Sequence, residues 1–312
     1  MGSIPPAPTL VPGQLLDRYE LLCPVAQGGM AQVWVARMQG KLGFERLVAI
    51  KTVIAEHALD DKFEKMFLDE ARIIERIRHP NVAQILDLGQ QGSLLFLVLE
   101  WVEGESAASL RRAVHGKGEK IPLNVVLRIL ADSCAGLHAA HELVNDHGEP
   151  LGVVHRDVSP SNVLVSSSGE VKLIDFGIAK LLEDDVDQAT IGLYTPDYAA
   201  PEQVTGKPIT TATDVYSLGV VMHELLLGVR PQGNPHRRPS VLAAELALAG
   251  KDEIKAALPM RAMKPMLQGD LDNIALKAAE FETFERYPSV EAFADDVRAH
   301  LLELRRPVDV GL

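Results

Sequence analysis

Cysteine is scarce in this sequence. Cys23 and Cys134 are the two cysteines among 312 residues, and no metal-ligand spacing surrounds either of them. This excludes a scaffold built on disulfides and leaves no cysteine-based zinc motif. We therefore expect two free thiols in a reducing compartment, and a cytoplasmic protein.

Positive charge is also in deficit. The chain has 31 Lys and Arg against 43 Asp and Glu, a formal net charge of −12. That balance argues against a general binder of nucleic acids or anionic membranes, although a net count does not reveal a local basic patch. No apolar run reaches the roughly 20 residues that span a bilayer, and the amino terminus lacks the features of a signal peptide. We expect no nucleic-acid partner and no membrane anchor within this chain.

Apolar residues are present in the amount that a substantial core needs, at 47% of the chain. Residues 19–54 alternate as strands, with Ala49 and Lys51 on one face and the residues between them on the other. After residue 60 the apolar residues recur at helical spacing, and the run at 94–102 is typical of a buried strand. Helical patterns then dominate. The predicted helices are 122–143, 214–228 and 289–304, the short strands are 163–165 and 171–175, and a Pro/Gly-rich loop covers 229–241.

This layout predicts an α+β protein with two lobes. We expect a flexible proline-rich arm over 1–18, a small antiparallel β-sheet lobe with one helix over 19–99, a hinge over 100–104, a larger and mainly helical lobe over 105–305, and a tail over 306–312. Clefts between such lobes are common ligand sites.

Two features of the sheet-rich segment could serve a nucleotide. The turn in VAQGGMAQV, at 25–33, could bring backbone N–H groups against phosphates, although taken alone a simple hairpin turn is the better explanation. Lys51, which ends VAIK, could hold phosphates and be oriented by Glu70 on the following helix. A lysine at a strand edge beside a solvated glutamate explains the pair as well.

Two further features lie in the helical segment. The loop in VVHRDVSPSNVLV offers Asp157 as a proton acceptor and Asn162 as an oxygen ligand for Mg²⁺, or it is an ordinary turn. Asp175 begins the tripeptide DFG after the strand VKLI, where a carboxylate could bridge Mg²⁺ to phosphates or simply end the strand.

Two structural roles are also expected. Glu202 of YTPDYAAPE should pair with Arg286, and Asp214 should accept hydrogen bonds from backbone N–H groups of the Asp157 loop. Each feature is modest alone, but QGGMAQV, VAIK, HRDVSPSN, DFG and AAPE follow one another in a set order, with 18 residues from Asp157 to Asp175. In this the chain resembles the eukaryotic-type (Hanks-type) serine/threonine protein kinase family over about residues 19–305, and the form of the motifs resembles its bacterial branch.

The resemblance implies transfer of the γ-phosphoryl group of ATP, with Mg²⁺, to Ser/Thr hydroxyls of protein substrates, and possible substrates include the chain itself. It implies Asp157 as the catalytic base, Lys51 on the phosphates, and Asn162 and Asp175 on Mg²⁺. The residues it implies around ATP are Val25, Ala26, Gly28, Gly29, Val33, Ala49, Lys51, Glu70, Glu100, Val102, Leu164 and Asp175. It also matches Leu99 with the gatekeeper position, and Ile74, Ile85, His155 and Phe176 with an apolar spine anchored by Asp214.

The chain departs from the family pattern in its nucleotide loop and its catalytic loop. Ala26 and Ala31 replace the outer glycines of the phosphate-covering loop, so we expect weaker or slower nucleotide handling. Ser159 stands where serine/threonine members place a lysine, and Ser161 stands where tyrosine kinases place an arginine. Loss of one such donor can cost roughly 10²–10³ in rate.

A third departure is an activation segment that is poor in hydroxyl groups. Thr190 is the candidate for phosphorylation, and Arg156 could pair with its phosphate. The acidic residues within 183–187 could instead supply part of that charge, and a solvated flexible loop is the plain alternative. Thr195 matches the threonine that the family places beside the substrate site.

The sequence thus favours an ATP-dependent serine/threonine protein kinase of bacterial signalling. A pseudokinase that binds ATP as a scaffold is the alternative, and Ser159 with the altered glycine loop favours it. The chain nevertheless retains Lys51, Glu70, Asp157, Asn162 and Asp175, all of which the resemblance assigns to ATP, catalysis or Mg²⁺. Their retention argues against a pseudokinase. A small-molecule phosphotransferase of related fold is a second alternative, but the AAPE segment and the region of Asp214 resemble a platform for protein substrates.

Overall fold

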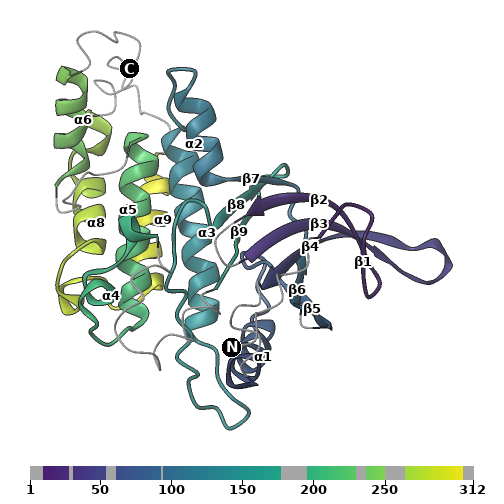
Figure 1. Ribbon diagram of the computed structural model, residues 1–312. Coiled ribbons are helices and arrows are strands. Elements are labelled where there is room, and N and C mark those ends of the chain that lie inside the picture. Colours follow the sequence, from purple (N-terminus) through teal and green to yellow (C-terminus); the bar gives the residue numbers. More distant parts are fainter. Residues whose placement is uncertain are drawn as a thin grey trace, which may run out of the picture. The chain divides into compact units, whose positions relative to one another are not determined.

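The computed structural model describes residues 10–27, 31–53, 61–92, 94–176, 195–229, 237–249 and 264–304. They divide into two compact units, with a boundary between Glu103 and Gly104. The first is a sheet unit with one helix and the second is mainly helical, as predicted (Figure 1). The extents of the hinge and of the kinase-like region stay predictions, and the tail at 306–312 lies outside the described residues.

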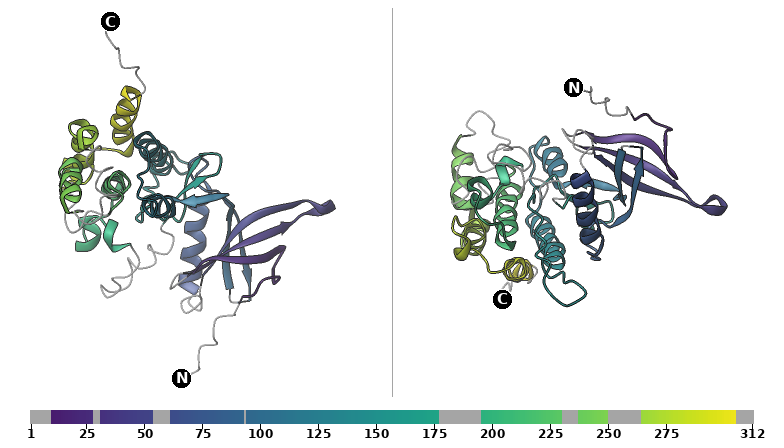
Figure 2. Two further views of the ribbon diagram at one scale, coloured as in Figure 1. Left: turned by 90° about the horizontal axis from the view of Figure 1, so that it is seen from above. Right: turned by 60° about the horizontal axis from the view of Figure 1, so that its bottom comes forward.

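The sheet unit is a six-stranded antiparallel sheet in the order β1-β2-β3-β4-β6-β5. Its strands are β1 (Leu15–Leu16), β2 (Tyr19–Gln27), β3 (Ala31–Gln39), β4 (Glu45–Val53), β5 (Ile85–Gln91) and β6 (Leu94–Glu100), and its helix is α1 (Asp61–Glu75). Both views in Figure 2 show α1 beside this sheet, where it contacts β5. The predicted strands and the single helix are confirmed, whereas β5 escaped prediction because polar residues and Gly89 interrupt its apolar pattern.

One face of this sheet is filled by apolar side chains, since alternate residues of a strand point to the same side. Val48 and Ile50 are fully buried there, while Ala49 and Lys51 lie on the other face and are half-buried, as the alternation predicts. The buried cluster consists of Leu16, Tyr19, Leu21, Trp34, Ala36, Val48, Ile50, Leu94, Phe96 and Val98.

The prediction of a flexible arm over 1–18 is wrong for its second half. Leu15 and Leu16 form β1 opposite Glu20 and Tyr19, and Leu16 is only 1% exposed in the core. Burial of such a side chain stabilises the folded state by about 1.5–3 kcal/mol. The proline-rich composition of this segment does not reveal that burial. Residues 1–9 lie outside the described residues.

The helical unit contains seven labelled helices and a small sheet in the order β7-β8-β9 within its described part. The helices are α2 (Ala107–His115), α3 (Leu123–His141), α4 (Pro201–Thr205), α5 (Thr211–Leu227), α6 (Pro239–Ala249), α8 (Asp270–Ala278) and α9 (Val290–Glu303); the strands are β7 (Gly104–Ser106), β8 (Val163–Ser166) and β9 (Val171–Leu173). The three predicted helices and both predicted strands are confirmed. The predicted loop at 229–241 ends earlier, because Pro239 begins α6 as its first residue.

Helix α3 lies at the centre of this unit, side by side with α5 and α9 (Figure 1). By length and mean hydropathy α3 would suffice to cross a membrane, although polar residues interrupt its apolar sequence. Its most apolar 18-residue window is 61% buried inside the protein. The core helix of a folded domain meets the same criterion, so the apolar surface of α3 is accounted for by its packing on α5, α9 and β9.

Candidate active site

The backbone of the loop at 155–162 is held by Asp214, which lies in the first turn of α5. Asp214 Oδ2 accepts from the His155 N–H at 2.8 Å, and Oδ1 accepts from the Arg156 N–H at 2.9 Å. The carboxylate is completely buried, so these two donors compensate for its lost hydration. The predicted role of Asp214 is confirmed.

The sequence did not identify His141, whose Nε2 lies 2.8 Å from Asp214 Oδ2. Burial alone would raise the pKa of Asp214, but the hydrogen bond with His141 and the backbone donor at His155 hold it below the ordinary value of 3.8. Asp214 therefore stays ionised inside the unit. No local signal separated His141 from the other histidines, apart from its place at the end of a predicted helix.

His155 fixes the loop from the opposite side. Its Nδ1 accepts from the Asp157 N–H at 3.3 Å, and its Nε2 lies 3.0 Å from the Ile174 carbonyl oxygen. Because a carbonyl can only accept, Nε2 carries the proton and the ring is neutral. Burial agrees with this, since it lowers the pKa of His155 below 6.5. The ring packs on Phe176 with centroids 4.5 Å apart, which brings together two of the four predicted spine residues.

The carboxylate of Asp157 is oriented by three donors. Oδ1 accepts from the backbone N–H and from the hydroxyl of Thr195, both at 3.1 Å. Oδ2 accepts from the Asn162 amide at 3.1 Å, and the same amide group donates to the Asp157 carbonyl oxygen at 2.9 Å. A carboxylate held in this way is set in one orientation before any substrate arrives.

Asn162 keeps its amide oxygen available. Its Nδ2 is taken by Asp157, and its Oδ1 accepts no hydrogen bond from the part of the chain that the structure describes. The Ile174 N–H donates to the Asn162 carbonyl oxygen at 3.0 Å, which ties the loop to the segment that ends in Asp175. An amide oxygen and a carboxylate on tied segments are ligands of the type that Mg²⁺ takes, so the residues fit this ion.

Two residues of this region have left-handed backbone conformations. Arg156 has φ of 64° and Asp175 has φ of 60°. Such angles are uncommon outside glycine and persist where the surroundings enforce them, as functional sites often do. The enforcing contacts at Arg156 are visible, because Gln203 of α4 donates to its carbonyl oxygen at 2.8 Å while Asp214 accepts from its N–H.

Ser159 is buried in the same loop and is 1% exposed. Its hydroxyl makes no hydrogen bond to any residue that the structure describes. The next residue, Pro160, accepts from the Ala108 N–H of α2 at 2.9 Å. The loop is therefore held from α2, α4 and α5, and a neutral hydroxyl without a partner stands where the family resemblance implies a lysine.

Three of the predicted nucleotide residues, Val33, Ala49 and Lys51, share one face of the sheet. Val33 and Leu97 pair with Lys51 across the neighbouring strands, so the three side chains point to the same side, with Ala49 two residues away. On β2, Val25 is 54% exposed, and Ala26 is also exposed. Gly28, Gly29 and the side chain of Glu70 lie outside the described residues, and so do Thr190 and the acidic run at 183–187.

Two residues with predicted ligand-binding backbone groups, Glu100 and Val102, lie at the end of β6 and just after it. The Glu100 N–H donates to the Gln84 carbonyl oxygen at 2.9 Å, so this N–H is not available to a ligand. The Val102 side chain is buried, and its backbone N–H makes no hydrogen bond within the described residues. Leu164, the remaining predicted residue, is half-buried on β8 of the helical unit.

The predicted pair of Glu202 and Arg286 is confirmed, with Nη1–Oε1 and Nη2–Oε2 distances of 2.8 Å. The Thr213 hydroxyl also donates to Glu202 Oε1 at 2.8 Å. Burial would raise the pKa of Glu202, but Arg286 and Thr213 together with a backbone donor hold it below 4.5. This ion pair secures α4, which carries the Gln203 contact to the loop.

Comparison with known proteins places these features in a family. A family model described as "Protein kinase domain" matches residues 19–260. The chain is 41% identical over 288 residues to "Tyrosine-protein kinase MasK" of Myxococcus xanthus, covering 91% of this chain and 43% of that protein. It is 33% identical over 297 residues to "Serine/threonine-protein kinase PknB" of Mycobacterium tuberculosis, covering 93% and 44%. The chain thus spans less than half the length of these relatives.

The fold is also that of a solved structure. The crystal structure of the Mycobacterium tuberculosis PknI kinase domain aligns with a TM-score of 0.68 at 24% identity, covering 94% of this chain and 99% of that one. At this identity the likeness shows the fold alone, and it confirms the predicted antiparallel sheet unit and helical unit of the protein kinase fold.

Proposed function

The chain belongs to the protein kinase family, and from that premise we propose that it transfers the γ-phosphoryl group of ATP to hydroxyl groups of proteins with the help of Mg²⁺. The observation that carries the proposal is the arrangement around Asp157. Its carboxylate is held by Thr195 and Asn162, and the same Asn162 keeps an amide oxygen without a partner in the described residues. A base and a cation ligand are thus positioned together.

In the proposed reaction the substrate hydroxyl oxygen attacks the γ-phosphorus, the bond from that phosphorus to the bridging oxygen breaks, and ADP leaves. Asp157 accepts the proton of the hydroxyl. Lys51 of the sheet unit binds the α- and β-phosphates, and Asn162 and Asp175 hold Mg²⁺. Bound by these two residues, Mg²⁺ would neutralise charge on the phosphate oxygens.

We assign the adenine to apolar side chains and free backbone groups. Val33 and Ala49 supply apolar side chains on one face of the sheet, and Leu164 supplies a further apolar side chain from β8. The Val102 N–H, which has no partner among the described residues, is a donor for the edge of the base. The exposed Val25 and Ala26 complete the cover over the nucleotide.

Serine and threonine are the proposed acceptors. Thr195 donates to Asp157, and this threonine matches the serine/threonine members of the family beside the substrate site. Tyrosine is the second candidate, because the relative named MasK, at 41% identity, is a tyrosine-protein kinase by name. The catalytic loop favours neither acceptor, because Ser159 replaces the lysine of serine/threonine kinases and Ser161 replaces the arginine of tyrosine kinases. A role in bacterial signalling and a cytoplasmic location are further proposals, supported by the bacterial relatives and the scarcity of cysteine.

An autophosphorylation assay with radiolabelled Mg-ATP tests the proposal. Asp157→Asn should reduce incorporation by about 10²–10⁴-fold while ATP binding, followed by calorimetry, persists. Lys51→Met should also abolish transfer. The matched controls are Asp295→Asn and Lys117→Met, which change exposed groups. Wild-type protein that binds ATP but incorporates no phosphate into itself or a general protein substrate would establish the pseudokinase instead. Acid hydrolysis of the product then separates phosphoserine and phosphothreonine from phosphotyrosine.

A further inference from the structure

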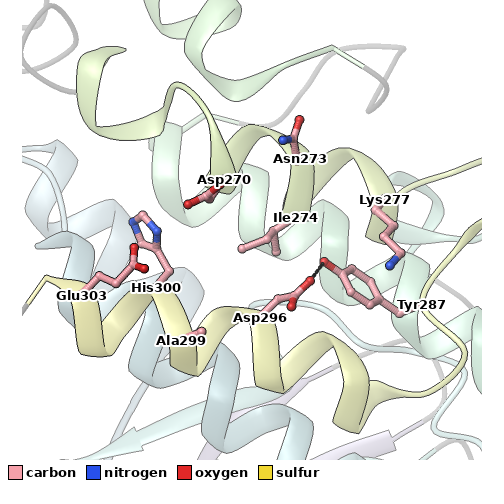
Figure 3. Close-up of a pocket in the computed structure, with 9 residues that line it drawn as sticks. All are labelled: Asp270, Asn273, Ile274, Lys277, Tyr287, Asp296, Ala299, His300 and Glu303. Atoms are coloured by element: carbon pink, nitrogen blue, oxygen red, sulfur yellow. Dashed lines mark hydrogen bonds between the residues drawn. The ribbon is translucent and has the colours of Figure 1, made fainter.

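Three potential metal ligands meet in a groove between α8 and α9 of the helical unit. They are Asp270, the first residue of α8, and His300 and Glu303 in the last turn of α9. One ligand atom of each lies within 4.8 Å of the others. Figure 3 shows Asp270 and His300 pointing toward one another across the groove, with Glu303 beside His300.

The helices bring these residues together in a direct way. Positions three apart on an α-helix share a face, so His300 and Glu303 extend toward the same neighbour. That neighbour is α8, which packs on α9. The first turn of α8 faces the last turn of α9, and this places Asp270 opposite the pair. One residue from one helix and an i, i+3 pair from another form a common way to build a metal site between helices.

None of the three side chains has a hydrogen-bond or ion-pair partner among the residues that the structure describes. Both ring nitrogens of His300 are shielded from solvent, and neither forms a hydrogen bond with any residue that the structure describes. No described residue forms an ion pair with Asp270 or Glu303. A shielded imidazole without a partner costs free energy, and two nearby carboxylates repel each other. A bound cation would relieve both costs at once.

At the other end of the groove, by contrast, the polar side chains have partners. There the Tyr287 hydroxyl donates to Asp296 Oδ2 at 2.7 Å, as the dashed line in Figure 3 marks. The Lys277 ammonium lies 4.2 Å from the centre of the Tyr287 ring. Within a groove of about 280 Å³, polar groups at one end are paired, while His300 and the carboxylates beside it have no partner in the described ranges.

We propose that Asp270, His300 and Glu303 bind a divalent transition-metal ion, and that Zn²⁺ is the ion they suit. One imidazole nitrogen and two carboxylate oxygens are accepted zinc ligands, and water completes a tetrahedral set. Zinc–ligand bonds of about 2.0–2.2 Å require the ligand atoms to approach more closely than 4.8 Å, which rotation of the exposed Asp270 and Glu303 side chains permits. The nitrogen ligand disfavours Mg²⁺ and Ca²⁺, which take oxygen. The ion would fasten the end of α9 to the start of α8.

Calorimetric titration of Zn²⁺ into the full chain, free of affinity tags and stripped of metal, tests this site in the absence of nucleotide. His300→Gln and Asp270→Asn should each remove one equivalent of Zn²⁺ or weaken its binding at least tenfold. The controls are His147→Gln and Asp295→Asn, whose side chains are exposed and lie outside the trio. They should bind Zn²⁺ as the wild type does.

Two further measurements keep the test decisive. Zn²⁺ should raise the unfolding temperature of the wild type, and this increase should vanish in His300→Gln. When Co²⁺ replaces Zn²⁺, the wild type should show visible absorption and Glu303→Gln should not. Because Glu303 is exposed at the end of a helix, this variant remains a test if His300→Gln does not fold. Wild-type stoichiometry and affinity in the His300, Asp270 and Glu303 variants alike would overturn the proposal.

Discussion

Arg286 holds the carboxylate of Glu202, 84 residues earlier in the chain, through two parallel hydrogen bonds of 2.8 Å. The Arg286 side chain is 0% exposed and that of Glu202 is 3% exposed. Arg286 also donates to the carbonyl oxygens of Ala212, Glu280 and Phe281. One guanidinium thus joins α4, the start of α5 and the turn after α8.

Arg286→Met should lower the free energy of unfolding by about 3–5 kcal/mol, because it leaves the Glu202 carboxylate buried without its cation. Urea unfolding measures this loss. The control is Arg298→Met, since Arg298 is 39% exposed and pairs with the equally exposed Glu291. Its loss should stay below about 1 kcal/mol. Equal losses for the two variants would contradict the assignment.

Thr195→Val should lower kcat by about 10- to 100-fold and leave the KM for ATP unchanged. The substitution removes the hydroxyl that donates to Asp157 Oδ1, and a hydrogen bond to a charged group is worth about 1.5–3 kcal/mol. Thr195→Ser keeps the donor and should retain most of the activity. Steady-state kinetics distinguish the two, and a valine variant with wild-type kcat would show that the backbone N–H suffices to orient the base.

Ser159→Ala should not reduce the free energy of unfolding. The hydroxyl is buried and has no partner among the described residues, so its removal should be neutral or should stabilise the protein by up to about 1 kcal/mol. Chemical denaturation without nucleotide checks this. A clear loss of stability would reveal a hydrogen bond that the present arrangement does not contain.

Ser159→Lys should raise the rate of phosphoryl transfer by up to about 10²-fold, because it supplies a charged donor near the base. The matched control is Ser161→Lys, which places the same charge at an exposed position of the same loop. Initial rates at saturating ATP compare the variants. An unchanged rate in Ser159→Lys would mean that another group already performs the task of the missing lysine.

Stability should decline as the pH falls below about 6.5. The pKa of His155 is lowered by burial, so the unfolded chain binds a proton that the folded protein resists. The stabilising contribution is complete above the unfolded pKa and is lost as the pH falls toward the folded pKa. Unfolding free energies measured between pH 7.5 and 5.5, values chosen to span about one unit on each side of 6.5, should show this slope. His155→Phe should have a shallower slope, and an equal slope would assign the effect to other histidines.

The sequence by itself determined the features that depend on local order. Strand alternation separated Lys51 from the core residues Val48 and Ile50, and helical spacing located α3, α5 and α9. The order of short motifs identified the Asp157 loop and its backbone anchor, Asp214. Periodicity and motif spacing are properties of neighbouring residues, so they are legible before folding.

Only the tertiary structure decided the features that depend on packing between distant segments. It placed Leu16 in the core of the sheet unit and gave Asp214 the partner His141. It also buried the Ser159 hydroxyl, which has no partner within the described part of the chain. It also brought Asp270 to His300 across two helices. No periodicity records such contacts, because they arise when whole elements dock and bring together side chains that the sequence keeps far apart.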